Sequence, residues 1–439
     1  MFGGVYLWCA IVLTVSVVVM VVATHARRGF PAPGGWPRLM DVALVASLGG
    51  VLVQLIPLPV ILVRILSPAR EKFLLATSLQ TGPPPAFLPL TIDASATVHA
   101  WLSLFSILAT FWIARALFSR GGVRTFSTII AWGAIALVLL AFAQHASGTT
   151  LVYGFWRPRD AGARPLGPFI NRNHLGTWSL LAICLCVGYL QWRTAHVTPP
   201  PTWRARLAGW MDGRRLVLQL AIVMLAAVLA LGASRSSLVA LVCAAGYVAV
   251  AGLARVPAPA RSGQRPASAS RVSLSSLAAL AIVAMLGYGD SSRLLLRVDE
   301  TRANGLANRV AIWRDTVPMM SDFPLTGVGA GAFGSAMRTY QTSPRTYFHN
   351  EAHNQYLQIA SEGGVLLSMP AAGALFAFIA TAWTQLRRRD DPMRWMRVAG
   401  VAALLGVAVQ SIWETGLTLP ANGMLAAALA ALVVHEERR

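Results

Sequence analysis

The sequence predicts an all-α, polytopic membrane protein, and three observations support this fold class. The 439 residues are 56% hydrophobic and only 12% charged, with a mean hydropathy of +0.58. So few charged residues could not cover the surface of a soluble domain. Long apolar runs recur along the chain, and a helix that crosses a bilayer needs about 20 such residues. Basic residues also gather between alternate runs, as they do on the cytoplasmic side of membrane proteins.

Eleven apolar runs are long enough to be membrane helices, and we therefore expect about 11 transmembrane helices. The first run has no basic segment before it and no A-x-A cleavage site, so it predicts a retained helix rather than a signal peptide. The runs lie near residues 3–24, 42–66, 97–118, 125–144, 174–192, 216–232, 236–254, 273–288, 363–383, 398–413 and 417–434.

The four cysteines all fall inside these runs. Disulfides need an oxidising aqueous compartment, and the C-x-C pair lacks the spacing of a zinc site. We expect all four to be small packing residues. They are Cys9, Cys184, Cys186 and Cys243.

The basic residues predict the orientation of the chain. One alternate set of loops contains 22 of the 37 lysines and arginines. The positive-inside rule assigns these loops to the cytoplasm, with the amino terminus outside and the carboxyl terminus inside. The net charge of +20 then orients the protein and contacts anionic membrane lipids. We expect no nucleic-acid partner.

The runs divide the chain into three parts. Residues 1–288 contain the first eight predicted helices, and residues 363–439 contain the last three with a cytoplasmic tail. Between them, residues 289–362 form one large extracytoplasmic loop. Connections of this length are functional or disordered, and the patterning of this one predicts order.

The large loop has two patterned segments. ANGLANRVAIWRDTVPMM spaces Leu306, Val310, Trp313 and Val317 by four, three and four residues, which predicts an amphipathic helix. DFPLTGVGAGAFG then predicts a glycine-rich bend with close backbone contacts. A dinucleotide-binding loop would need a preceding strand in a βαβ unit, and no such strand is predicted.

Two clusters of polar residues lie at the outer ends of predicted helices. GPFINRNHLGTW contains Asn171, Arg172 and Asn173, which could bind an oligosaccharide or phosphate. The alternative is helix capping, with Asn173 as the N-cap. LGASRSSLVAL holds Arg235 in a tight turn before a helix N-terminus, a combination suited to anions such as phosphate. The alternative for Arg235 is contact with lipid headgroups.

The large loop supplies further candidates. Arg309 and Arg314 are five residues apart and so face different sides of a helix. One binds ligand, in our interpretation, while the other pairs with Asp315 or solvent. HNEAH contains His353 but has neither the spacing nor the third ligand of a zinc site. At neutral pH His353 could position or deprotonate a hydroxyl, or it could cap a helix.

Ionisable residues are scarce within the predicted spans. Ion-coupled carriers place such groups near the middle of the bilayer. Their scarcity disfavours a transporter but leaves it as an alternative.

Five segments together resemble the O-antigen ligase and polymerase superfamily of bacterial envelope glycosyltransferases. They occur in the family's order, from about residue 89 to 415: PLTIDASATVHAWL, GPFINRNHLGTW, SRSS, NRVAIWRDTVPMMSDFPLTGVGAGAF and AHNQYLQIASEGGVLL. The last two are the most specific, because they join arginine, FPLTGVG and H-N-x-x-L-x-x-x-x-E-x-G in one loop. Relatives commonly have twelve spans rather than eleven.

The resemblance implies a GT-C-like fold in the bacterial inner membrane with the active site facing the periplasm. Such enzymes move a glycan from undecaprenyl diphosphate to a sugar hydroxyl, with inversion and without a metal or cofactor. The acceptor is lipid A–core in ligases and a second lipid-linked repeat unit in polymerases. The family's diphosphate-binding arginines correspond to Arg235 and Arg309, and its loop histidine corresponds to His353. Arg172 stands where many relatives have another residue.

The candidate site therefore has defined roles. Arg235 and Arg309 hold the diphosphate, with help from Arg172, because preorganised cations stabilise its developing charge. His353 orients or activates the acceptor hydroxyl and Asn354 supports it. Glu362 holds the loop against the following helix.

Two other functional classes remain open at this stage. A permease for a small anion would use the same arginines for selectivity. A non-catalytic component, working with polysaccharide assembly proteins in an export complex, would tolerate their loss. The sequence does not separate ligase from polymerase.

Overall fold

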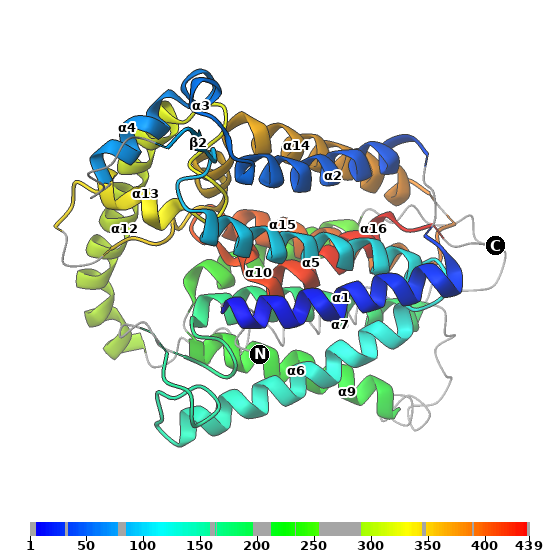
Figure 1. Ribbon diagram of the computed structural model, residues 1–439. Helices are drawn as coiled ribbons and strands as arrows, with labels where there is room; N and C mark the ends of the chain where they lie inside the picture. Colours follow the sequence, from blue (N-terminus) through cyan, green and yellow to red (C-terminus); the bar gives the residue numbers. More distant parts are fainter. Residues whose placement is uncertain are drawn as a thin grey trace.

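The computed structural model describes residues 6–30, 34–77, 85–158, 163, 165–195, 212–232, 234–253, 291–344, 348–388 and 390–436. Within them the chain is almost entirely helical, with one two-stranded sheet. The long helices run side by side in a bundle (Figure 1). The predicted all-α membrane protein is confirmed as the fold class.

Eight described helices are long and apolar enough to cross a membrane, and each overlaps one of the predicted runs. They are α1 (Leu7–Arg28), α2 (Gly35–Leu55), α5 (Ala94–Phe118), α6 (Val123–Ala146), α7 (Arg172–Ala195), α9 (Gly213–Gly232), α10 (Arg235–Leu253) and α14 (Gln355–Leu386).

The other three predicted runs leave the helix count open. α15 (Arg394–Gln410) and α16 (Pro420–Val434) are shorter, with 17 and 15 residues. The run 273–288 lies outside the described residues. The expected number of eleven spans therefore stays a prediction.

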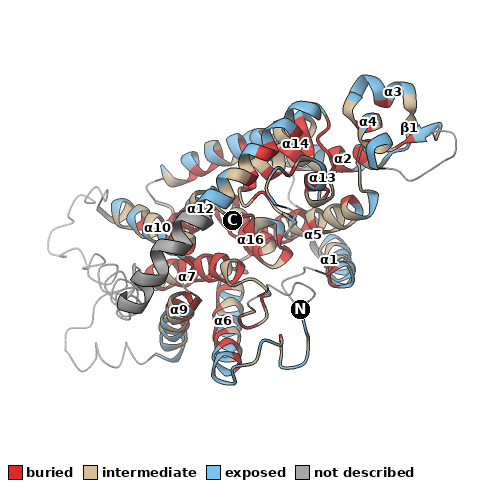
Figure 2. Cartoon of the chain, turned by 90° about the vertical axis from the view of Figure 1, so that its left-hand side faces the viewer, coloured by how far each residue is buried: buried red, intermediate tan, exposed pale blue. Residues whose placement is uncertain are grey.

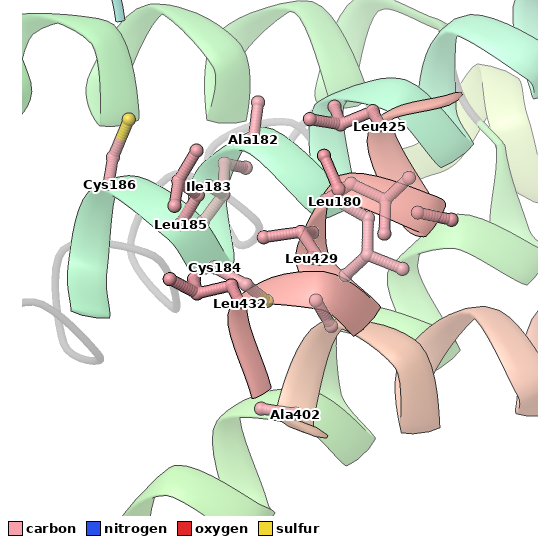
Figure 3. Close-up of a cluster of buried hydrophobic side chains, with 14 of the residues drawn as sticks. Leu180, Ala182, Ile183, Cys184, Leu185, Cys186, Ala402, Leu425, Leu429 and Leu432 are labelled. Carbon is pink, nitrogen blue, oxygen red and sulfur yellow. The ribbon is translucent and has the colours of Figure 1, made fainter. Parts of the chain in front are cut away.

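α7 lies at the centre of the bundle and is buried along most of its length. It packs against α9, α15 and α16, and Figure 3 shows leucines of α7 and α16 meeting there. Cys184 and Cys186 are buried free thiols in this core. Their predicted role as packing residues is confirmed.

The predicted run 42–66 is wrong as a single helix. α2 ends at Leu55, and the chain continues through β1 (Leu58–Pro59) into α3 (Val60–Leu66) and α4 (Pro68–Thr77). Pro57 and Pro59 cause the break, because proline lacks the amide hydrogen of a helix interior and restricts the residue before it. β1 pairs antiparallel with β2 (Phe87–Leu88), and the chain then enters α5.

A helical layer covers one end of the bundle. It contains α3, α4, α12 (Ser291–Asp322) and α13 (Phe333–Tyr340), gathered at the left of Figure 1. Figure 2 views this end, with α12 crossing in front of the membrane helices. α14 begins at Gln355, so residues 355–362 of the segment predicted as loop are helical.

The predicted amphipathic helix forms, but the face that packs on the protein is not the one that carries the predicted apolar stripe. Val310 and Val317 are 50% and 56% exposed, whereas Ile312 and Met319 are almost fully buried. The reason is that α12 packs through this second face onto α13 and the glycine-rich bend. The side chain of Leu306 lies outside the described residues.

Candidate functional site

The glycine-rich bend after α12 packs its backbone directly on the first turns of α14. Gly327 has a φ of +65°, and a Cβ added there would lie 2.2 Å from the carbonyl of Glu362. Gly329 has a φ of +109°, and a Cβ there would lie 2.0 Å from Oγ1 of Thr91. Only glycine fits such positions, so the predicted close backbone contact is confirmed.

Glu362 joins this bend to α14. Its side chain accepts hydrogen bonds from Gln358 Nε2 at 2.6 Å and from the backbone amide of Phe333 at 3.4 Å. Its backbone carbonyl accepts from the amide of Gly329 at 3.0 Å and from Gln54 Nε2 at 2.9 Å. These contacts agree with the expectation that Glu362 holds the loop against the helix.

The residue that caps α7 is Asn171, and the expectation that Asn173 is the cap is wrong. Asn171 Oδ1 accepts from the Asn173 amide at 2.9 Å, since the helix begins at Arg172, two residues earlier than expected. The side chain of Asn173 instead donates from Nδ2 to Glu414 Oε1 at 2.9 Å. Arg172, the first residue of α7, is half-buried beside them.

Glu414 brings α12 and α7 together. Its Oε1 also accepts from Arg309 Nη2 at 2.8 Å, and the carboxylate is 2% exposed whereas Arg309 is 28% exposed. Burial raises the pKa of Glu414 to about 7, and nearby Glu351 adds to the rise while Arg309 opposes it. A second contact joins the turn after α15 to the loop before α14, since Thr415 Oγ1 donates to Glu351.

His353 lies near Glu351 and Arg309 and has a constrained backbone conformation. It has a φ of +49°, and its Nδ1 is buried with no hydrogen-bond partner among the described residues. Burial lowers the pKa of His353, the Glu351 carboxylate opposes this, and Arg309 adds to the lowering. The imidazole is therefore neutral at pH 7 and able to accept a proton.

Hydrogen bonds fix the loop that carries His353. Trp313 Nε1 donates to the carbonyl of Ala352 at 3.0 Å, and Gln358 Oε1 accepts from the Ala352 amide at 2.7 Å. Asn354 is the N-cap of α14, because its Oδ1 accepts from the amides of the next turn. Asn354 thus supports His353 through the backbone that follows it.

The remaining predicted arginines lie outside the Glu414 cluster. Arg235 is the exposed first residue of α10, and the serines next to it pack closely on the start of α7. It therefore lies at the same end of the bundle as Arg309. Arg314 is exposed. This agrees with solvent contact, one of its two expected environments, whereas the Asp315 carboxylate accepts from Thr342.

Sequence reasoning did not assign a role to the two carboxylates of the site. They are Glu351 and Glu414. Their partners lie 64 and 105 residues away in the sequence, so local patterning contains no signal for the pairing. Among the described residues, no group of three His, Cys, Asp or Glu side chains is arranged to hold a metal ion.

The arrangement combines a partly exposed guanidinium, a neutral imidazole and two carboxylates at one end of a membrane bundle. It can bind an anion and accept a proton from a hydroxyl. Residues 220–371 match the family model described as Wzy_C, O-antigen ligase. This range includes Arg235, Arg309 and His353. A comparison with curated proteins finds no match.

Proposed function

We propose that the chain, in which residues 220–371 match the O-antigen ligase family model, transfers a glycan from undecaprenyl diphosphate to a sugar hydroxyl. The reaction takes place without a metal ion at the periplasmic face of the bacterial inner membrane, on a GT-C-like fold. The observation that carries the proposal is the cluster of Arg309, Glu414 and His353. Its arginine and histidine lie within the matched residues.

The donor explains why the site lies at the end of the bundle. Its polyprenyl chain stays in the bilayer, whereas its sugars and diphosphate lie in water. Arg309 and Arg235 bind the diphosphate oxygens, and guanidinium groups suit this task because they donate several hydrogen bonds in a fixed plane. Arg172 and Arg314 provide further donors for phosphate or glycan oxygens, as do Asn171 and Asn173 where their amide groups are accessible.

The chemical step is a single displacement. The acceptor oxygen forms a bond to the anomeric carbon from the face opposite the diphosphate, so the configuration inverts. The bond from this carbon to the phosphate oxygen breaks, and its electron pair leaves with the diphosphate. His353 takes the proton of the acceptor hydroxyl, while the arginines stabilise the charge that develops on the leaving group.

The test is glycan transfer by purified protein in lipid nanodiscs with a defined undecaprenyl-diphosphate-linked oligosaccharide. The single variants Arg235→Ala, Arg309→Ala and His353→Ala should each lose transfer while still inserting in the membrane. Arg338→Ala is the matched control, since this exposed arginine lies in α13 at the same end and should retain full activity. Full activity in all three site variants would reject the assignment.

The same preparation separates the remaining alternatives. A permease would take up anions into sealed vesicles and consume no lipid-linked glycan. A non-catalytic component would be inactive in the purified wild-type form. Transfer to lipid A–core identifies a ligase, and growth of lipid-linked repeat units without this acceptor identifies a polymerase.

A further inference from the structure

Glu414 occupies an unusual position for a carboxylate. It lies in the turn between α15 and the short helix η2 (Gly416–Thr418), where it is 2% exposed. One oxygen accepts from both Arg309 and Asn173, at 2.8 and 2.9 Å. The other oxygen, Oε2, is buried without a hydrogen-bond partner in the described part of the chain. Burying a charge that is only half satisfied is costly, so packing alone does not account for this residue.

The geometry shows what the carboxylate does to Arg309. A guanidinium has five N–H groups in one plane, and the contact with Glu414 uses Nη2. The side chain of Arg309 remains 28% exposed, so the contact with Glu414 leaves it open to the surface. Asn173 contacts the same carboxylate oxygen from α7 and thereby fixes the carboxylate itself.

We propose that Glu414 is a positioning residue that holds Arg309 by one side and directs its other N–H groups to the donor diphosphate. The proposal rests on the proposed function, since it assigns a role within that reaction. Glu414 does not touch the substrate. It lies outside the residues that match the family model.

The charge of Glu414 makes this role dependent on pH. The charged groups that act on it are Arg309 of α12 and Glu351 of the loop before α14. Both also act on His353, as do His174 of α7 and His349. Burial raises the pKa of Glu414 to about 7. Below that pH the carboxyl gains a proton and its pairing with Arg309 weakens, whereas above it the pair is intact. Transfer should therefore decline as the pH falls through about 7, before His353, whose pKa is lowered below 6.5, becomes protonated.

The experiment compares the pH profile of glycan transfer between wild type and Glu414→Gln in nanodiscs. The amide keeps an acceptor oxygen for Arg309 but cannot titrate. The acidic decline near pH 7 should therefore disappear in this variant and return only at the lower pH set by His353. Glu414→Ala should raise the KM for the lipid-linked donor about tenfold or more, because a charge-assisted hydrogen bond is lost. Glu414→Asp retains a titrating carboxylate and should keep the acidic decline.

Matched measurements separate the possible failures. Glu71→Gln removes a carboxylate of α4 that pairs with Arg64, and its pH profile should equal that of wild type. If wild type transfers glycan and Glu414→Gln keeps the same acidic decline, the positioning role is rejected while the proposed function stands. An inactive wild type rejects the proposed function and this role together. If Glu414→Gln fails to insert, Glu414→Asp provides the test. A pH profile of this variant without the acidic decline rejects the positioning role.

A second, independent observation concerns the outer surface of α3. Ile61 and Ile65 are 69% and 67% exposed, and Leu62 and Leu66 are 43% and 37% exposed. Members of each pair are four residues apart and so lie on the same side of the helix. Water is an unfavourable environment for four neighbouring aliphatic side chains.

This surface continues a membrane-facing one. Leu52 and Val53 near the end of the membrane helix α2 are 44% and 40% exposed, and Ile56 just after it is 48% exposed. α3 begins only five residues after α2 ends. We infer that α3 lies in the boundary between headgroups and acyl chains, on the side of the membrane that holds the candidate site. Arg64, which is 62% exposed, can reach lipid phosphates from this depth.

The depth of α3 can be measured with spin labels in nanodiscs of phosphatidylethanolamine and phosphatidylglycerol. A label at Ile65→Cys should be relaxed more by oxygen than by a water-soluble nickel complex, as at Val45→Cys in the exposed face of α2. Thr77→Cys, in the exposed end of α4, should show the opposite preference. Nickel accessibility at Ile65 equal to that at Thr77 would reject the lipid contact. Protection from both reagents would also reject it, because it would mean that protein covers α3.

Discussion

Gly327 provides the sharpest test of how the bend is built, through the substitution Gly327→Ala. The added Cβ would lie 2.2 Å from the carbonyl of Glu362, far below the 3.0 Å that real Cβ contacts respect. The obstructing atoms are backbone, so they cannot move without displacing α14. A φ of +65° costs an alanine about 1–2 kcal/mol, and overpacking adds about 1–3 kcal/mol. The free energy of unfolding should fall by about 2–5 kcal/mol.

The measurement is equilibrium unfolding in mixed micelles of a mild detergent and dodecyl sulfate, followed by far-UV circular dichroism. Gly133→Ala is the matched control, because a Cβ at this position in α6 meets nothing within 4 Å. It should change stability by no more than about 1 kcal/mol. A Gly327→Ala protein as stable as this control would refute the close packing of the bend on α14.

Three other contacts lead to measurable outcomes. Arg115→Ala leaves the carboxylate of Asp41 without the partner that lies 2.7 Å from it, so the same assay should show a loss of about 3 kcal/mol. Arg64→Ala removes an exposed ion pair with Glu71 and should not measurably change the free energy of unfolding. Equal losses in Arg115→Ala and Arg64→Ala would contradict this reasoning. Asn171→Ala removes the cap of α7 and should cost about 1 kcal/mol, so wild-type stability would argue against the cap. Trp313→Phe removes the hydrogen bond that holds the histidine loop. The kcat of reconstituted glycan transfer should therefore fall, whereas the free energy of unfolding should change little. An unchanged kcat would rule out this support.

The membrane helices could be predicted because their signal is local. Each described span is a continuous apolar segment, and hydrophobicity alone locates it. The break after α2 could not be found in this way, since the residues from Leu58 to Leu66 are as apolar as the helix before them. Pro57 and Pro59 are the features of the sequence that indicate the break, because proline cannot occupy the interior of a helix without disrupting it.

The site could be predicted only in part. Arg309 and His353 stand in recognisable motifs, and the structure brings them near each other through the carboxylates of Glu351 and Glu414. The carboxylates themselves gave no usable signal, because their partners come from distant segments. The buried face of α12 could not be predicted for a related reason. Periodicity predicts a helix, but tertiary contacts decide which of its faces is buried.

The contact of Asn173 with Glu414 joins residues 241 positions apart in the sequence. A ribosome delivers the earlier residue to the membrane long before the later one. Until the turn that follows α15 has been synthesised, Arg309 lacks its anionic partner. A chain truncated before that turn therefore carries the histidine and both arginines of the candidate site but not the carboxylate that holds one of them. The cluster can therefore be completed only after the turn that follows α15 has been synthesised.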